Sequence, residues 1–206
     1  DVGSGKTLVG ALSALHAKSN GWQTALLCPT EILAEQHFNS FQTWFDHLGI
    51  KTELLTGSTK AKDKKQIVKE LAKGEIDILI GTHAIFQSGV DFDKLGLTII
   101  DEQHRFGVHQ RFSMLEKGGK EQLSPHQLIM TATPIPRTLA MTVYGSLETS
   151  VIDELPPGRK PIKTVHKFDR DKEGVFLFLK ERLEFGEQVY IIFPLIEESE
   201  KLDYKN

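Results

Sequence analysis

The chain begins DVGSGKTLVGALSALHAK (residues 1–18), a glycine-rich turn that runs directly into a helical pattern. Its segment Gly3-Ser4-Gly5-Lys6-Thr7 matches the phosphate-loop pattern G-x-x-x-x-G-K-[ST], whose first glycine would stand immediately before Asp1. Glycines let backbone N–H groups curl around phosphates, and the N-terminus of the following helix adds partial positive charge. In such a loop Lys6 reaches the β and γ phosphate oxygens and the Thr7 hydroxyl binds Mg²⁺. The pattern therefore predicts a nucleotide phosphate site; an ordinary glycine-rich turn before a helix is the alternative.

Short aliphatic runs alternate with helical patterns after this loop. Near-continuous aliphatic runs are typical of strands in a parallel sheet that is buried on both faces. The predicted strands span 24–28, 52–55, 77–80, 97–100 and 127–130, and the predicted helices span 7–18, 31–48 and 60–73. The first helix is expected to turn Leu8, Ala11, Leu12 and Leu15 inward. The alternation predicts an α/β fold with a mostly parallel sheet, whose ligands bind at the carboxyl ends of the strands.

The proline- and glycine-rich segment 154–161 is typical of a domain boundary. We therefore predict a first domain over 1–150, a linker over 151–163 and the start of a second domain over 164–206. In that second part, a helix is expected over 171–185, with Val175, Phe176, Leu179 and Leu183 at helical spacing, and a strand over 189–193. One helix and one strand are too few for an independent domain, so the second domain is expected to be truncated.

Composition excludes several classes of protein. Lysine plus arginine number 25 and aspartate plus glutamate 28, giving a formal net charge of −3, so binding of nucleic acid by bulk attraction alone is excluded. A local DNA-binding site is not excluded by this charge. The single Cys28 forms no intramolecular disulfide, and the chain has neither a signal-peptide pattern nor an apolar run of about 18 residues, so we expect a cytoplasmic protein without a membrane span. The eight histidines show no zinc spacing.

A second motif, LTIIDE at 97–102, sets two acids at the end of a predicted buried strand. Asp101 can hold Mg²⁺ through water at that position, and Glu102 can orient and deprotonate an attacking water. Acids often end strands, so the pattern is informative only together with the phosphate loop. The interval between the two motifs leaves room for three β-α units of roughly 30 residues each, more than a small GTPase needs. The chain also has no Asn-Lys-x-Asp guanine-reading motif.

Four short motifs resemble those of superfamily 2 helicases and translocases. They are Pro29-Thr30-Glu31 (motif Ia), Gly81-Thr82-His83 (motif Ib), Asp101-Glu102-Gln103-His104 (the Asp-Glu-x-His box) and Thr131-Ala132-Thr133 (motif III). Within that superfamily the stretches 29–37, 99–111, 128–142, 152–161 and 188–203 are similar to the bacterial branched-DNA helicases. The transcription-repair coupling translocases share the RFGV and TATPIPRT segments, but they usually have a second acid where Gln103 stands and lack DELPPGR.

The resemblance implies a RecA-like ATP motor that moves on duplex DNA and remodels replication forks or Holliday junctions in recombination and repair. It further implies a monomeric, nucleoid-associated bacterial protein. ATP and Mg²⁺ would be bound by Gly3, Ser4, Gly5, Lys6, Thr7 and Asp101, with Lys6, Asp101 and Glu102 catalytic. Hydrolysis would be coupled to DNA movement by Gln103, His104, Thr131, Thr133 and Arg137. One DNA strand would lie on Pro29, Thr30, Gly57, Ser58, Thr82 and His83, held by backbone amides and hydroxyls, which add no formal charge.

Two other functions remain open from the sequence. The arginine fingers of the family lie near the end of the second motor domain, beyond residue 206, and their loss costs ~10³ to 10⁵ in rate. A nucleotide-binding module without turnover is therefore an alternative, and we expect these 206 residues alone to hydrolyse ATP negligibly. The transcription-repair coupling translocase is the other alternative, and it differs in partner rather than in motor. A lysine-rich helix face, formed by Lys60, Lys62, Lys64, Lys65, Lys69 and Lys73, could contact DNA or simply face solvent.

Overall fold

The computed structural model describes residues 3–102, 124–132, 148–152, 154, 158 and 162–192. The chain divides into two compact units, Asp1–Gly158 and Arg159–Asn206, and the division falls inside the predicted linker 151–163. Among the described helices, none is both long and apolar enough to cross a membrane.

The first unit is built on a parallel sheet. Its described strands are β1 (Gln23–Leu27), β2 (Thr52–Leu55), β3 (Ile78–Gly81), β4 (Leu95–Asp101) and β5 (His126–Met130). They pair in the order β2-β3-β1-β4-β5, and all four pairings are parallel. The parallel α/β sheet predicted from aliphatic runs is therefore confirmed. Because every strand runs the same way, the loops that follow the strands all leave from one edge of the sheet.

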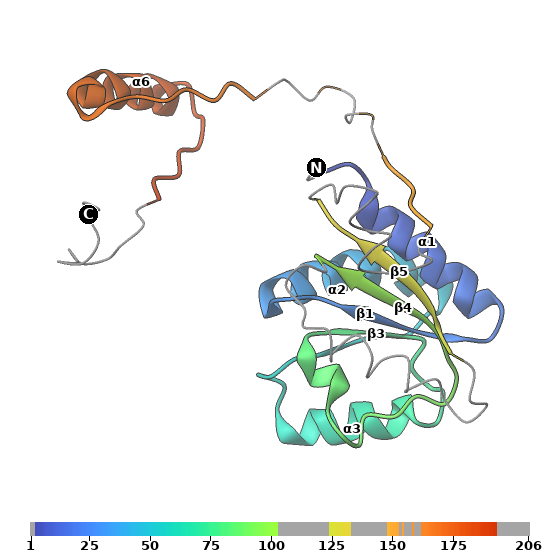
Figure 1. Ribbon diagram of the computed structural model, residues 1–206. Coiled ribbons are helices and arrows are strands. Elements are labelled where there is room, and N and C mark those ends of the chain that lie inside the picture. The colour runs from blue at the N-terminus through green and yellow to red at the C-terminus, as the bar shows by residue number, and fades with distance from the viewer. Residues whose placement is uncertain are drawn as a thin grey trace. The chain divides into compact units, whose positions relative to one another are not determined.

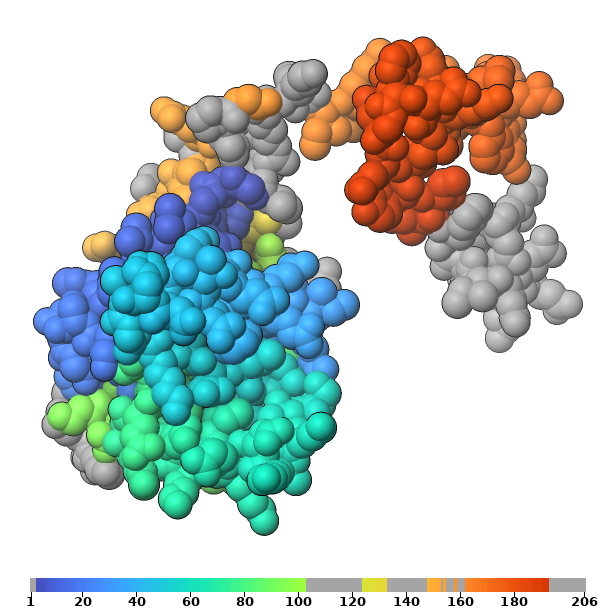
Figure 2. Space-filling view, turned by 180° about the vertical axis from the view of Figure 1, so that it is seen from behind, coloured from blue at the N-terminus to red at the C-terminus, as the bar shows by residue number. Residues whose placement is uncertain are grey.

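Helices cover both faces of this sheet (Figure 1). The helices α1 (Lys6–Ser19) and α2 (Glu31–Phe45) pack on one face and α3 (Ala61–Leu71) on the other. Figure 2 shows the same unit from behind, with the blue part of the chain above the teal to green segment that contains α3. Each face of the sheet has its own hydrophobic core, and successive residues of a strand point into different cores. Leu26 and Ile80 pack in the core on the α2 side, whereas Leu27 and Leu79 pack in the core on the α3 side. Two short 3-10 helices lie in the connections, η1 (Asp46–Leu48) between α2 and β2 and η2 (His83–Phe86) between β3 and β4.

The inner face predicted for α1 is wrong in part. Its buried residues are Gly10, Ala11 and Ala14, whereas Leu8 and Leu12 are 52% and 57% exposed. The helix lies so close to the sheet that a Cβ on Gly10 would stand 3.4 Å from the sulfur of Met130. Small residues therefore make the contact, and the leucines are turned to the flank of the helix. Periodicity alone predicted the larger apolar side chains inward.

In the second unit the described residues contain the turn η4 (Asp169–Asp171) and the helix α6 (Lys172–Glu184). The predicted helix is confirmed. It has no buried residue, and both Phe176 and Leu183 are more than half exposed. The predicted strand 189–193 is also wrong for residues 189–192, which form no strand; Phe193 lies outside the described residues. A strand needs a hydrogen-bonded neighbour, and residues 162–192 contain no other strand.

Candidate active site

The strand register brings the predicted functional loops to one edge of the sheet. Leu27 at the end of β1 pairs with Gly81 of β3 and with Ile100 of β4. Gly81 also pairs with Leu55 of β2, and Asp101 pairs with Met130 of β5. The residues that follow these positions are Pro29-Thr30, Gly57-Ser58, Thr82-His83, Asp101-Glu102 and Thr131. Segments far apart in the chain, such as those that follow Leu27 and Ile100, thus become neighbours at the carboxyl ends of the strands.

The phosphate loop has the backbone that its glycines permit. Gly3 and Gly5 adopt φ angles of 84° and 89°, in the left-handed region that favours glycine. Gly5 is the N-cap of α1, and no side chain among the described residues caps it. A Cβ at Gly5 would meet no atom within 4 Å, so the position is open. The ammonium of Lys6 donates to the Ser4 hydroxyl across 3.2 Å. An open, uncapped helix start beside a lysine fits a phosphate group.

The acid pair stands at the end of β4. Asp101 is only 9% exposed, and its Oδ1 accepts a hydrogen bond from the backbone N–H of Glu102 at 3.0 Å. Its Oδ2 lies 2.7 Å from Nε2 of His37. Glu102 has a φ angle of 49°, the single positive value among the described non-glycine residues. Backbone strain of this kind is concentrated at functional sites, because surrounding contacts must maintain it. The strained backbone turns the chain sharply at the residue predicted to be the general base.

Cys28 lies beside this acid pair and takes no chemical part. Burial raises the pKa of its thiol far above the usual range, and the negative charge of Asp101 raises it further. The thiol is therefore protonated at neutral pH. A protonated, buried thiol is neither a nucleophile nor a metal ligand.

Thr7 and Asp101 fit a magnesium ion that is bound mainly by phosphate. The described residues contain no group of three or more His, Cys, Asp or Glu side chains that could hold a metal ion by themselves. Mg²⁺ in nucleotide sites takes one or two protein oxygens and completes its shell with phosphate oxygens and water. A threonine hydroxyl and a buried aspartate supply that kind of donor set.

Glu31 links two of the segments predicted to contact DNA, the start of α2 and the loop after β2. Its Oε1 accepts from the Ser58 backbone N–H at 3.1 Å, and its Oε2 accepts from the Ser58 hydroxyl at 2.8 Å. The Ser58 hydroxyl bond, followed by backbone bonds to this loop, lowers the pKa of the Glu31 carboxyl. Thr30 caps α2 by accepting from the N–H of Leu33. The start of α2 and the loop after β2 thus form one bonded surface.

Exposure differs among the residues predicted to contact DNA. Thr30, Gly57, Ser58 and His83 are exposed, and Pro29 is half-buried. Thr82 is 3% exposed, and its hydroxyl has no hydrogen-bond partner among the described residues. Of the predicted coupling residues, Thr131 is half-buried after β5, while Gln103, His104, Thr133 and Arg137 lie outside the described residues. On α3 the predicted lysine face is exposed, except that Lys64 is half-buried and donates to Gln87.

Sequence reasoning missed His37. It falls inside the stretch 29–37 that carries the family resemblance, but no role was predicted for it. Two signals were available, because His37 shares the inner face of α2 with Ala34 and Phe41, and a histidine on such a face requires a polar partner. The identity of that partner depends on the tertiary fold.

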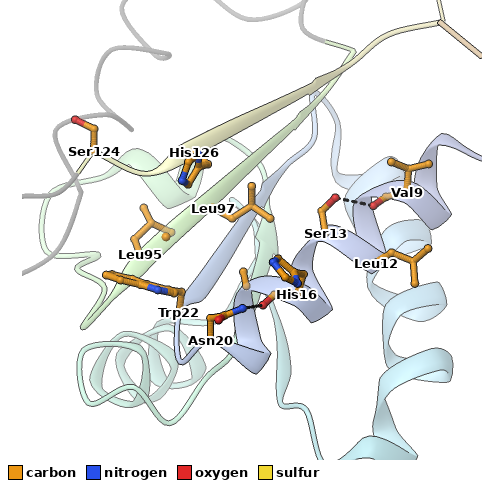
Figure 3. Close-up of a pocket in the computed structure, with 12 residues that line it drawn as sticks. Val9, Leu12, Ser13, His16, Asn20, Trp22, Leu95, Leu97, Ser124 and His126 are labelled. Carbon is orange, nitrogen blue, oxygen red and sulfur yellow. Dashed lines mark hydrogen bonds between the residues drawn. The ribbon is translucent and has the colours of Figure 1, made fainter. Parts of the chain in front are cut away.

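The large apolar pocket of the first unit is separate from this site (Figure 3). It has a volume of about 780 Å³ and lies along the flank of α1 and the amino ends of β4 and β5. Leu12, Trp22 and Leu95 contribute apolar lining. Its polar groups are partly bonded to their own helix, since Ser13 donates to the Val9 carbonyl and Asn20 to the His16 carbonyl. The phosphate loop and the acids stand at the opposite, carboxyl edge, so this pocket is not the nucleotide site.

A phosphate loop before the first helix and an Asp-Glu pair at a strand end of a parallel sheet define a P-loop nucleotide-binding core of the helicase class. Residues 1–142 match the family model described as DEAD/DEAH box helicase, and the chain belongs to that family. Over its whole length it is similar to the ATP-dependent DNA helicase RecG. It is 53% identical to RecG of Synechocystis sp. over 205 residues and 54% identical to RecG of Escherichia coli (strain K12) over 204 residues.

These alignments cover 100% and 98% of the chain, but only 24% and 29% of the two relatives. The chain thus spans about a quarter of the length of the curated relatives that it matches. A solved structure described as RecG bound to a three-way DNA junction superposes with a TM-score of 0.79 at 42% identity, covering 95% of this chain and 26% of that one. The predicted resemblance to the bacterial branched-DNA helicases and the predicted RecA-like α/β class are confirmed.

Proposed function

We propose that this chain is the first motor domain, and the start of the second, of an ATP-dependent DNA helicase that couples ATP hydrolysis to the remodelling of replication forks and Holliday junctions. The observation that carries this proposal is the row of loops along one sheet edge, from the acid pair after β4 to the exposed Thr30 and Ser58. Similarity to RecG proteins, one of them solved on a three-way DNA junction, supports branched DNA as the substrate. The proposal includes a monomeric motor in the bacterial cytoplasm, associated with the nucleoid.

The phosphates of ATP are held by the start of α1. Backbone amides of residues 3–7 and the Lys6 ammonium supply positive charge, and the open backbone at Gly5 lets the phosphates approach closely. Thr7 and Asp101 supply oxygen ligands for Mg²⁺. A Mg²⁺ ion held by these residues would supply positive charge to the phosphates during hydrolysis. Lys6 contributes to the same stabilisation from the protein side.

Glu102 acts as the general base. Its carboxylate orients the water that attacks the γ-phosphate and takes the proton that this water loses. The left-handed backbone at Glu102 aids this role, because it turns the residue away from the strand direction that Asp101 still follows. Two adjacent acids can then serve different tasks, Asp101 toward the metal and Glu102 toward the water.

DNA is held by the exposed loops at the same edge. Backbone amides and the hydroxyls of Thr30 and Ser58 can contact phosphates of one strand, and such contacts need no net positive charge. Thr82 is less suited because its hydroxyl is buried. Movement of the strand is coupled to hydrolysis through the segments that follow β4 and β5. The coupling residues proposed on those segments are Gln103, His104, Thr131, Thr133 and Arg137.

The test compares the full-length protein with its Glu102→Gln and Lys6→Ala variants. Glu102→Gln keeps the shape and removes the base, so we expect retained binding of a fluorescent ATP analogue and a fall in hydrolysis of ~10²- to 10⁴-fold. Lys6→Ala is expected to weaken nucleotide binding itself. Undiminished hydrolysis by Glu102→Gln would remove Glu102 from this role, and unchanged ATP affinity in Lys6→Ala would contradict the phosphate-loop assignment.

DNA specificity is tested with the unmodified full-length protein. We expect a three-way junction to stimulate ATP hydrolysis more strongly than a linear duplex with the same number of base pairs. Equal stimulation by the two DNAs would contradict the branched-DNA part of the proposal and leave the motor part standing. Stimulation that requires RNA polymerase would favour the transcription-repair coupling alternative.

A further inference from the structure

His37 is buried in the middle of an apolar helix face. It is 7% exposed and lies on the inner side of α2 between Ala34 and Phe41, both of which are fully buried. An imidazole in such a place is costly unless its ring nitrogens find polar partners. A leucine or phenylalanine would satisfy the packing of this face without that cost. Packing therefore does not explain a histidine at this position.

The partner of His37 is the predicted Mg²⁺ ligand, 64 residues further along the chain. Nε2 of His37 lies 2.7 Å from Oδ2 of Asp101, and the two side chains are only 9% and 13% exposed. An ionised carboxylate can only accept, so Nε2 donates. A bond of this length to a charged acceptor is among the stronger hydrogen bonds in proteins. The contact is thus sheltered from water and specific in geometry.

Both oxygens of Asp101 are held, and from different directions. The backbone N–H of Glu102 is shared between Oδ1 and the Met130 carbonyl oxygen, at 3.0 Å from each, while the His37 ring donates to Oδ2. Two bonds at separate oxygens fix the rotation of the carboxylate about its own bond as well as the position of the side chain. The helix that carries His37 is itself anchored at its start, where Glu31 is bonded to Ser58. The imidazole is therefore a rigid support rather than a mobile contact.

We propose that His37 is a positioning residue for the magnesium site, holding the Asp101 carboxylate in the orientation that binds Mg²⁺ with the nucleotide. The inference rests on the proposed function, since it takes Asp101 as a magnesium ligand. Carboxylates that bind metals are themselves oriented by outer hydrogen bonds, and loss of such a partner typically costs about 10- to 100-fold in metal affinity. Without the ring donor, the Asp101 carboxylate can rotate about its remaining bond to Glu102.

Two substitutions separate the hydrogen bond from the packing. His37→Gln places an amide nitrogen the same number of bonds from Cα as Nε2 of histidine, so it keeps a donor in reach of Asp101. His37→Met fills a similar volume with a flexible apolar side chain and offers no donor. Both are made in the full-length protein. The probe is a fluorescent, non-hydrolysable ATP analogue, titrated with Mg²⁺, and the readout is the Mg²⁺ concentration that gives half-maximal tight binding.

We expect His37→Met to raise this Mg²⁺ concentration roughly 10- to 100-fold and His37→Gln to restore it to within a few-fold of the unmodified protein. Binding of the analogue without Mg²⁺ should be equal in all three proteins, because the phosphate loop is untouched. An unchanged Mg²⁺ requirement in His37→Met would overturn the proposal. A Gln variant as impaired as the Met variant would overturn it as well, since the donor would then not be the cause.

A second measurement follows the unmodified protein, and His37→Gln serves in it only to assign one signal. In the unmodified protein labelled with ¹⁵N-histidine, the ring N–H signal that is missing from His37→Gln should shift when Mg²⁺ and the analogue are added together, and not when Mg²⁺ is added alone. A signal that ignores the metal-nucleotide complex contradicts the proposal. The proposed function fails separately, if the unmodified protein binds no nucleotide at any Mg²⁺ concentration.

Discussion

Gly81 offers the sharpest test of how the site edge is built. It is the last residue of β3 and the first of the Gly-Thr-His motif, which ends at the exposed His83. A Cβ at this position would stand 1.9 Å from the carbonyl oxygen of Leu55 on the neighbouring strand, whereas real Cβ contacts are essentially never closer than 3.0 Å. In the Gly81→Ala variant the ends of β2 and β3 must therefore separate by about 1 Å. The obstacle is backbone, so no side chain can move aside to relieve it.

The cost follows from the bonds at this point. Two backbone hydrogen bonds are strained, Thr82 N–H to the Leu55 carbonyl at 3.3 Å and Cys28 N–H to the Gly81 carbonyl at 2.9 Å. Each is worth about 0.5 to 1.5 kcal/mol net, and overpacking adds about 1 to 3 kcal/mol. We expect Gly81→Ala to destabilise this edge of the sheet by roughly 2 to 6 kcal/mol.

Hydrogen exchange read by mass spectrometry is the suitable assay, because a chain of several domains does not unfold in one step. A cost of ~2 kcal/mol or more corresponds to exchange at least about 30-fold faster in peptides that cover residues 78–82. The matched control is Gly10→Ala, where the new Cβ meets the flexible Met130 sulfur at 3.4 Å and the helix gains about 1 kcal/mol of propensity. Exchange at 78–82 should be unchanged in that control. Exchange at the unmodified rate in Gly81→Ala would refute the close approach of β2 and β3.

Three further predictions concern single side chains. The pKa of Glu31 in the folded protein is lowered from 4.5, so its bonds to Ser58 are complete above pH 4.5 and are lost as the pH falls through the lower folded value. The amide resonance of Ser58 should follow this titration, and in Glu31→Gln the resonance should no longer change over that pH range. Alkylation mapped by mass spectrometry should leave Cys28 unmodified in the folded protein and label it after unfolding, since burial raises the pKa of its thiol; native labelling would contradict this. Gln23→Ala should destabilise the first unit by roughly 2 to 4 kcal/mol, because two buried carbonyls at 2.7 and 3.1 Å lose their donor. Hydrogen exchange in peptides that cover β1 and β3 should become faster, and exchange at the unmodified rate would exclude that role.

Much of the fold was predictable because the signals for its helices and strands lie within short stretches of sequence. The strand over 52–55 was predicted at its observed bounds, and the helix predicted from residue 31 begins at Glu31. Gly74 has a φ angle of 74° in the turn that follows α3, a backbone conformation that glycine adopts without strain. Failures came where a partner decides the outcome. Leu12 is turned outward because Gly10 and the sheet leave no room, and residues 189–192 form no strand since the described part of their unit offers none to pair with.

The candidate site divides in the same way. The phosphate loop, the acid pair and the loop motifs are each a short run of consecutive residues, so the chemistry of each can be predicted from the sequence. The hydrogen bond from His37 to Asp101 cannot be predicted in this way, because it joins positions 64 residues apart and depends on the packing of α2 on the sheet. The same holds for the burial of Thr82, whose hydroxyl the sequence motif gave no reason to place in the interior.

The sequence by itself determined a parallel α/β class, the phosphate loop at the start of α1 and the acids at the end of β4, since glycine torsions, aliphatic runs and carboxylates act over a few residues. Only the tertiary structure decided the strand order β2-β3-β1-β4-β5, which lines up the ends of β2, β3 and β1 beside the acid pair. It also decided which atom holds Asp101 in place. Strand order and buried hydrogen bonds depend on contacts between distant segments, and those contacts exist only after the helices have packed on the sheet.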